Sequence, residues 1–323
     1  MDWVKLIGGG MLLYFGAEWF VGGASALALA LRIPQILVGL TVVAYGTSAP
    51  EVIVGIEAAR DGHGDVAIGN VVGSNIANIG LILGIAALIK PARVDGSLRR
   101  REMPVMLLST ALVPLVLMNG KVEPWEAFAL LAMAVAYTGW MVRSARSAVQ
   151  IAAATADTTT AAEATDAAGA PKPGGRWRSA ITALVGLVVL LVGGKLFVAG
   201  AVSAARSLGI SEKMTGLTIV AVGTSLPELI TSIIAARKGH SDLAVGNVLG
   251  SNIFNVFLCL GASALAGTVA MSLVKGAFDL VVLSIMTLLA ALFIRTERLI
   301  TRLEGWVLVA LYSAFMVLTI VRG

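Results

Sequence analysis

Long apolar stretches alternate with short polar breaks along almost the whole chain. A helix needs roughly 20 mostly apolar residues to cross a bilayer, and ten stretches reach or approach that length. Charged residues, prolines and glycines separate them. The predicted spans lie at 4–30, 35–59, 66–89, 103–119, 124–142, 179–207, 213–236, 243–266, 274–294 and 304–321. The pattern predicts an all-α polytopic membrane protein with ten transmembrane helices.

Composition agrees with this prediction. Of the 323 residues, 58% are hydrophobic and only 13% are charged, and the mean hydropathy is +0.90. Soluble domains are about 25% charged, so the surface of this chain must face lipid. The single cysteine, Cys259, excludes a disulfide within the chain and a cysteine-based zinc site. The basic residues are scattered between apolar stretches, which indicates topology signals; no nucleic acid and no protein partner is implied.

Two segments of the chain repeat each other. Residues 39–84 and 216–261 align at a constant offset of 177 without a gap, and 30 of the 46 aligned positions are identical. Five predicted spans separate equivalent positions, and because five is odd the two copies cross the membrane in opposite directions. The prediction is two inverted five-helix repeats, 1–142 and 179–323, joined by a flexible Ala/Thr-rich linker at 143–178. Inverted repeats build secondary transporters whose site lies where the halves meet.

The distribution of basic residues predicts the orientation. Of the 24 lysines and arginines, 16 fall in loops on the side of the linker and 7 on the opposite side. The positive-inside rule then makes the linker cytoplasmic and both termini extracytoplasmic. The first apolar stretch is too long for the core of a signal peptide, so we expect it to remain as the first helix. A prokaryotic cytoplasmic membrane is the predicted location.

Each repeat places one glutamate, Glu51 or Glu228, deep in an apolar span. Intramembrane acids usually face a cavity and mark an ion path. A proline before each acid loosens the preceding turn, so that the carbonyls of Ala44 and Ala221 can point into a cavity. Neighbouring hydroxyl and amide side chains are Thr47, Ser48, Ser74, Asn78, Thr224, Ser225, Ser251 and Asn255. All these groups offer oxygen, which predicts a site for hard cations such as Ca²⁺ or Na⁺.

The paired GTSxPE and GSNIxN blocks resemble the α-repeats of the calcium/cation antiporter superfamily, particularly its prokaryotic sodium/calcium exchangers. The resemblance covers essentially the whole chain. It implies that Glu51 and Glu228 bind the transported cations, assisted by nearby hydroxyls and by the carbonyls of Ala44 and Ala221. Spans 2, 3, 7 and 8 would hold the site, and spans 1 and 6 would slide across it. The expected function is Ca²⁺ efflux coupled to Na⁺ influx, without a cofactor and without enzymatic chemistry.

The residues leave several alternatives open. Asn255 stands where one branch of the family carries aspartate, so the two ionised glutamates leave two negative charges in the pocket and the Na⁺:Ca²⁺ ratio stays undecided. A proton/calcium antiporter using the same site is the main alternative. An intramembrane diacid hydrolase and a passive channel fit the residues less well. Glu18 and Lys195 occupy equivalent positions in spans 1 and 6 and are possible ion-pair partners for the two acids.

Overall fold

The computed structural model describes residues 2–93, 96–156, 175–208, 221–297 and 299–322, and nearly all of them are helical. The first half contains α1 (Asp2–Leu31), α2 (Gln35–Val38), η1 (Gly39–Val43), α3 (Ala44–Thr47), α4 (Ala49–Arg60), α5 (Gly64–Ala77), η2 (Asn78–Leu83), α6 (Gly84–Ile89), α7 (Gly96–Val116) and α8 (Pro124–Ala156). The second half contains α9 (Gly175–Ser207), α11 (Ala221–Gly223), α12 (Leu226–Arg237), α13 (Ser241–Phe254), η4 (Asn255–Leu260), α14 (Gly261–Ala266), α15 (Leu273–Glu297) and α16 (Arg302–Arg322). The segments marked η are π-helical.

The described helices follow the order of the predicted spans. Seven helical segments are long and apolar enough to cross a membrane, and the segment Gln35–Thr47 forms an eighth candidate with α4, bent by 42° at their junction. The predicted span 103–119 corresponds to α7, which begins earlier because the helix continues through its basic residues. The predicted span 213–236 lies partly outside the described residues. The prediction of an all-helical polytopic fold is confirmed.

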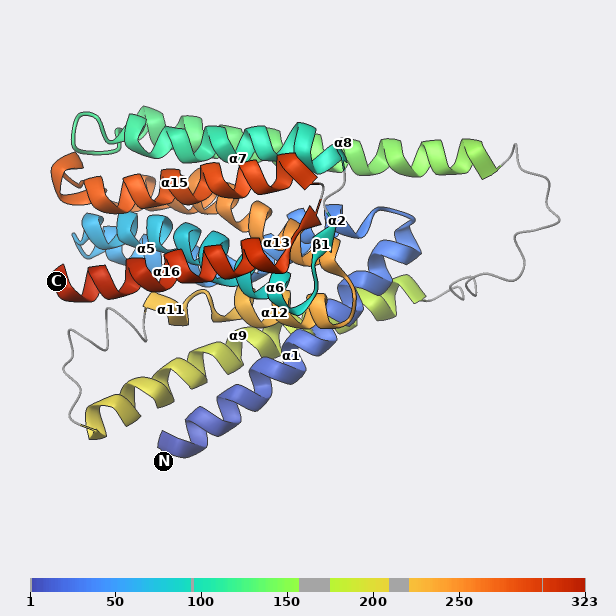
Figure 1. The fold of residues 1–323 in the computed structure, drawn as a ribbon, viewed down its shortest axis with the longest axis horizontal. Helices are drawn as coiled ribbons and strands as arrows, with labels where there is room; N and C mark the ends of the chain where they lie inside the picture. Colours follow the sequence, from blue (N-terminus) through green and yellow to red (C-terminus); the bar gives the residue numbers. More distant parts are fainter. Residues whose placement is uncertain (1, 94–95, 157–174, 209–220, 298, 323) are drawn as a thin grey trace.

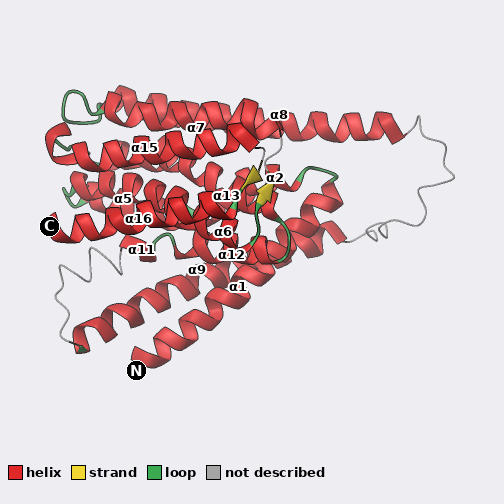
Figure 2. Cartoon of the chain, in the orientation of Figure 1, coloured by secondary structure: helices red, strands yellow, loops and turns green. Residues whose placement is uncertain are grey.

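One short sheet interrupts the helices. Strand β1 (Ala92–Arg93) pairs antiparallel with β2 (Leu299–Ile300). Figure 2 shows these two strands among the helices. The pairing joins the loop before α7 to the loop before α16, and so ties the two halves of the chain together.

The helices on either side of the predicted linker are longer than the spans predicted from the sequence. Helix α8 continues past 142 to Ala156, and α9 begins at Gly175, before 179. The alanine-rich composition of this part of the chain favours helix, which explains the extension of α8. Residues 157–174 of the predicted linker lie outside the described residues. Both termini lie at one end of the molecule, and α8 ends at the opposite end (Figure 1).

A pseudo-two-fold axis relates the two halves and passes between α7 and α15. The hydroxyl oxygens of Thr110 and Thr287 lie 3.3 Å apart, and these residues differ by the offset of 177 that relates the repeats. Two equivalent residues can contact each other only where they adjoin the symmetry axis. The inverted arrangement therefore extends well beyond the 46 residues that repeat in sequence.

Helices α1 and α9 cross on a line of glycines, and Figure 1 shows them side by side, below the remaining helices. We call this contact the glycine seam; it consists of Gly9, Gly16 and Gly23 of α1 with Gly186 and Gly193 of α9. A Cβ atom on Gly16 would lie 2.4 Å from the nitrogen of Leu190, and one on Gly193 would lie 2.5 Å from the nitrogen of Leu13. Small residues permit such close approach of helix backbones in membranes.

Candidate functional site

Each repeat breaks its helix just before the candidate glutamate. Helix α3 ends at Thr47, Ser48 takes φ −81° and ψ 4°, and α4 begins with Pro50 and Glu51 in its first turn. Proline is tolerated there because the first amides of a helix have no partner within the helix. The second repeat does the same, with Ser225 at φ −87° and ψ 7° before α12. The helix N-terminus favours a negative charge at this position.

The two repeats meet through a crossed pair of hydrogen bonds. Ser48 Oγ donates to Glu228 Oε1 at 3.1 Å, and Ser225 Oγ donates to Glu51 Oε1 at 3.3 Å. Each carboxylate is thus bound by the serine of the other repeat. Both glutamates are 1% exposed. The pseudo-symmetry therefore converges on one buried site with two carboxylates.

The site contains most of the unpartnered buried polar atoms among the described residues. Eight buried side-chain atoms in the described part of the chain lack a hydrogen-bond partner, and six of them belong to residues predicted to bind cations. These six atoms are Glu51 Oε2, Glu228 Oε2, Asn78 Nδ2, Asn78 Oδ1, Ser251 Oγ and Asn255 Oδ1. Nowhere in the described chain do three or more His, Cys, Asp or Glu side chains cluster as a metal site. The available ligands are therefore two carboxylates completed by hydroxyl and amide oxygens.

Two π-helical segments begin at the candidate amide ligands. Segment η2 starts at Asn78 and η4 starts at Asn255. A π-helical turn inside an α-helix is rare and occurs frequently at functional sites. Neither segment is predicted from the sequence, because periodicity over a uniformly apolar span does not distinguish a π-turn from an α-turn.

Asn75 orients one of these amides and was missed by the sequence analysis. The Nδ2 of Asn255 donates to Asn75 Oδ1 at 3.0 Å, and Asn75 Nδ2 donates to the carbonyl of Asn252 at 3.2 Å. The amide nitrogen of Asn255 is thereby occupied, and its Oδ1 is left free of any partner. The repeated GSN triplet, which contains Asn75 and Asn252, was the signal in the sequence.

Further side chains brace the helix breaks. Asn70 Nδ2 and Cys259 Sγ both donate to the main-chain carbonyl of Glu51, at 3.0 and 3.1 Å. In the second repeat Asn247 Nδ2 donates to Ser232 Oγ at 3.0 Å, and Thr47 Oγ1 lies 3.3 Å from Asn247 Oδ1. The equivalent asparagines thus make different contacts, so the two repeats are not in identical conformations.

The remaining predicted ligands lie around the same break. Ser74 is buried and Thr224 is half-buried. The carbonyl of Ala44 accepts the amide of Ser48 at 3.0 Å, so one of its two lone pairs belongs to the helix. Ala221 begins α11, and its side-chain environment lies outside the described structure. Glu18 pairs with Lys238 at 2.7 Å and Lys195 is exposed, so neither partners the site glutamates.

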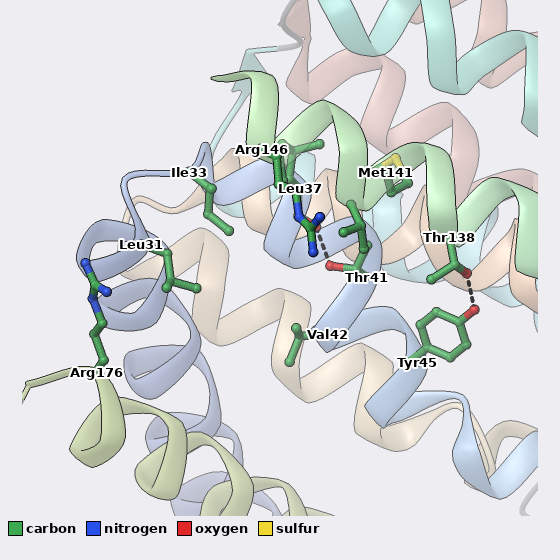
Figure 3. A pocket seen from close by; sticks show the side chains of 12 residues that line it. Leu31, Ile33, Leu37, Thr41, Val42, Tyr45, Thr138, Met141, Arg146 and Arg176 are labelled. Atoms are coloured by element: carbon green, nitrogen blue, oxygen red, sulfur yellow. Dashed lines mark hydrogen bonds between the residues drawn. The ribbon is translucent and has the colours of Figure 1, made fainter. Parts of the chain in front are cut away.

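A separate cavity of about 750 Å³ opens on the flank of the molecule. Figure 3 shows it between the start of the second span and α8, with Arg146 and Arg176 on either side and Tyr45 deeper along it. Most of its lining is apolar, and neither glutamate contributes to it. Tyr45 closes it on the inside by bonding Thr138 and packing on Phe254, at 3.8 Å between ring centroids. This cavity is therefore distinct from the cation site.

Comparison with known proteins identifies the family. The sequence model described as "Sodium/calcium exchanger protein" matches residues 1–143 and 178–321. The chain belongs to the sodium/calcium exchanger family. The family predicted from the GTSxPE and GSNIxN blocks is confirmed, and the protein is a transporter and not an enzyme.

Relatives of this exchanger-family protein match it over most of their length. It is 33% identical to sodium/calcium exchanger MaX1 of Methanosarcina acetivorans over 343 residues, covering 98% of each chain. It is 40% identical to inner membrane protein YrbG of Escherichia coli (strain K12) over 260 residues, covering 80% of this chain and 78% of that one. A solved structure of the sodium-calcium exchanger NCX_Mj, soaked with Na⁺ and Ca²⁺, matches with a TM-score of 0.82 and 32% identity, covering 97% and 96% of the two chains.

Proposed function

We propose that this protein is a secondary antiporter that exchanges Na⁺ for Ca²⁺ by alternating access, normally exporting Ca²⁺ as Na⁺ enters. Glu51 and Glu228 bind both ions in competition. The observation that carries the proposal is the set of six unpartnered buried atoms on five predicted ligand residues. A buried polar atom without a partner is costly, and a cation bound by the five oxygens among them removes that cost for those oxygens.

The chemistry of the ligands supports Ca²⁺ and Na⁺ as cargo. Carboxylate, hydroxyl, carboxamide and carbonyl oxygens suit hard cations, whereas zinc and copper sites typically include histidine nitrogen or cysteine sulfur ligands. The two carboxylates supply the only formal charges among the candidate ligands. One Ca²⁺ or more than one Na⁺ balances them, which makes the two ions competitors for one pocket.

The crossed serine–glutamate bonds favour exchange over a passive pore. Because each carboxylate is held by the opposite repeat, the full ligand set exists only when the two repeats are docked together. An ion that completes this set stabilises the docked arrangement, and differential affinity between the two facing states then drives the cycle. The sites of inverted-repeat transporters lie at such an interface.

We place the protein in a prokaryotic cytoplasmic membrane with both termini extracytoplasmic. The excess of basic residues on the side of the linker supports this orientation. The relative YrbG is described as an inner membrane protein, which supports the location. The division into repeats 1–142 and 179–323 around a cytoplasmic linker at 143–178 is part of the same proposal.

Flux through purified protein in liposomes tests the proposal. Vesicles are loaded with Na⁺, diluted into Na⁺-free buffer containing Ca²⁺, and assayed for Ca²⁺ uptake under Na⁺ and H⁺ gradients imposed separately. We expect uptake driven by Na⁺ and abolished in Glu51→Gln, with Lys5→Gln as a matched control for an exposed charge. Uptake driven by H⁺ alone would replace Na⁺ as the coupling ion, and full activity of Glu51→Gln would overturn the site.

A further inference from the structure

An ion pair connects α1 to the turn after α12. Lys238 Nζ lies 2.7 Å from Glu18 Oε1 and donates to the main-chain carbonyl of Glu18 at 3.3 Å. The two side chains are 35% and 32% exposed for glutamate and lysine. Lys238 directly follows α12, the helix that carries Glu228 in its first turn. The pair therefore connects the α1–α9 crossing to a helix of the cation site.

The equivalent positions carry the same pair with the charges exchanged. The offset of 177 relates Glu18 to Lys195 and Lys238 to Asp61. Asp61 directly follows α4, the helix that carries Glu51 in its first turn. The two turns read ARDGHGD and ARKGHSD, and their only difference in charge is the aspartate and lysine at this position. Between α1 and α9, the position of Glu18 and Lys195 is the only one at which both helices carry a charge.

These two reversals compensate each other. Had only one position reversed its charge, one repeat would hold an attractive pair and the other would hold two like charges. With both reversed, each repeat keeps one acid and one base for the same contact. In a pseudo-symmetric protein, a charge reversal at one position needs a matching reversal at the other only if both equivalent contacts form at some stage.

One of the two contacts is formed in this structure. Lys238 reaches Glu18, whereas Lys195 and Asp61 are both exposed and make no ion pair with each other within the described residues. In a transporter built from inverted repeats, access alternates as one repeat moves against the other. In the opposite-facing state, α9 then contacts the turn after α4. This contact is the equivalent of the one that α1 makes with the turn after α12 in this structure.

We infer that Glu18–Lys238 and Lys195–Asp61 are two alternative latches, each closing in one facing state of the transport cycle. This inference rests on the proposed function, because it requires alternation between two states. The pair Glu18–Lys238 holds the state seen here. The pair Lys195–Asp61 forms when the α1–α9 pair moves and the first contact opens.

The exposure of the pair suits such a role. Partly exposed ion pairs are weak, and one of them shifts a two-state equilibrium by about two- to fivefold. A transporter must leave each state in every cycle, and a much stronger contact would trap it in one of them. Two weak latches of similar strength keep both states accessible.

Distance measurements by pulsed electron paramagnetic resonance test the inference on the full chain. Spin labels are attached to cysteines at Leu29, near the end of α1, and Leu303, near the start of α16, which are 65% and 74% exposed. The background is Cys259→Ser, because Cys259 is the only native cysteine. The ratio of the two distance populations reports the balance between the facing states.

We expect opposite shifts from the two latches. Glu18→Gln lowers the population that matches this structure by about two- to fivefold, and Lys195→Gln raises it by a similar factor. Exchanging the two charges, with Glu18→Lys and Lys238→Glu in one protein, restores the ratio. Lys5→Gln removes another exposed charge of α1 and leaves the ratio unchanged. If Lys195→Gln and Asp61→Asn leave the ratio unchanged, or shift it in the same direction as Glu18→Gln, the inference is wrong.

A second variant covers the case in which the first one fails to fold. If Glu18→Gln aggregates on size exclusion, Lys238→Gln is used instead, because it removes the same ion pair from the side of the turn. The distance measurement does not require the protein to transport ions, so it is independent of the flux assay. A protein that shows opposite shifts but carries no Na⁺-driven Ca²⁺ flux would retain the latches and lose the proposed cargo, so the two failures are distinguishable.

Discussion

Ser48 donates a hydrogen bond to Glu228 across the boundary between the repeats, at 3.1 Å, and its equivalent Ser225 does the same for Glu51 at 3.3 Å. These two bonds join α4 to α12 at the site where both carboxylates are buried. Under the proposed function, a ligand set assembled from both repeats makes binding of the cation and docking of the repeats a single event.

Removal of either serine hydroxyl weakens cation binding. A hydrogen bond to a charged group contributes about 1.5–3 kcal/mol, so Ser48→Ala and Ser225→Ala are each expected to raise the half-saturating Ca²⁺ concentration roughly tenfold or more. Isothermal titration with Ca²⁺ measures this change. Ser313→Ala on the exposed face of α16 is the matched control. An unchanged affinity in both site variants would show that the crossed bonds do not contribute to the bound state.

Loss of Asn75 releases the amide of Asn255. Asn75→Ala removes the acceptor that holds Asn255 Nδ2, and the freed amide is then able to turn its nitrogen toward the cation. We expect Ca²⁺ affinity to fall while the protein still elutes as a folded species. Asn119→Ala, in an exposed loop, serves as the control. Wild-type affinity in Asn75→Ala would mean that packing alone orients Asn255.

The glycine seam predicts a steric effect on stability. A Cβ on Gly16 would meet the Leu190 nitrogen at 2.4 Å, whereas Gly8 has no neighbouring atom within 4 Å. Overpacking of this kind costs about 1–3 kcal/mol, and alanine at Gly8 gains helix propensity. Thermal unfolding is therefore expected to occur at a lower temperature in Gly16→Ala and at an equal or higher temperature in Gly8→Ala. Equal destabilisation by both would argue against close backbone contact.

The surroundings of His240 predict that the folded protein loses stability in mild acid. Burial, together with Lys238 and Lys90, lowers the pKa of His240 below its usual value of 6.5. Its Nε2 lies 3.3 Å from Ser25 Oγ, which accepts a hydrogen bond from Gln35. Because the folded protein favours the neutral imidazole, the unfolded chain binds more protons, and stability falls as the pH drops below about 6.5.

Thermal unfolding between pH 7.5 and 5.5 checks this dependence. The carboxylates also titrate with pH, so the relevant quantity is the difference between the wild type and His240→Gln. We expect the variant to show a shallower decline in melting temperature. His63→Gln alters the equivalent residue of the first repeat, which is exposed, and is expected to follow the wild type. If melting temperature falls with pH in the same way in all three proteins, His240 is not the cause of the lower stability in acid.

The sequence predicted the helical order and the two glutamates because both leave strong local signals. Apolar length alone defines a membrane span, and an acid within such a span has few structural explanations. The gapless repeat pairs Glu51 with Glu228 from the sequence alone. Their burial in a shared site follows from the inversion of the two copies.

Other features depend on contacts that the sequence does not encode locally. The π-helical starts at Asn78 and Asn255 depend on how the central helices pack, and the orientation of Asn255 depends on Asn75 of the other repeat. The extension of α8 to Ala156 was missed because a polar, alanine-rich stretch reads as a linker when only hydropathy is considered. The partner of Glu18 was also missed, because Lys238 lies 220 residues away.

The glycine seam also has a consequence for uncoupled leakage of ions through the protein. With backbone against backbone along their crossing, α1 and α9 are unable to shift past each other without collision. Under the proposed alternating access they therefore move as one rigid body, so that entry from either side is controlled by a single moving part and opening toward one compartment closes the other. Two independent gates would sometimes stand open together and let Ca²⁺ run down its gradient; a single shared gate has no such state.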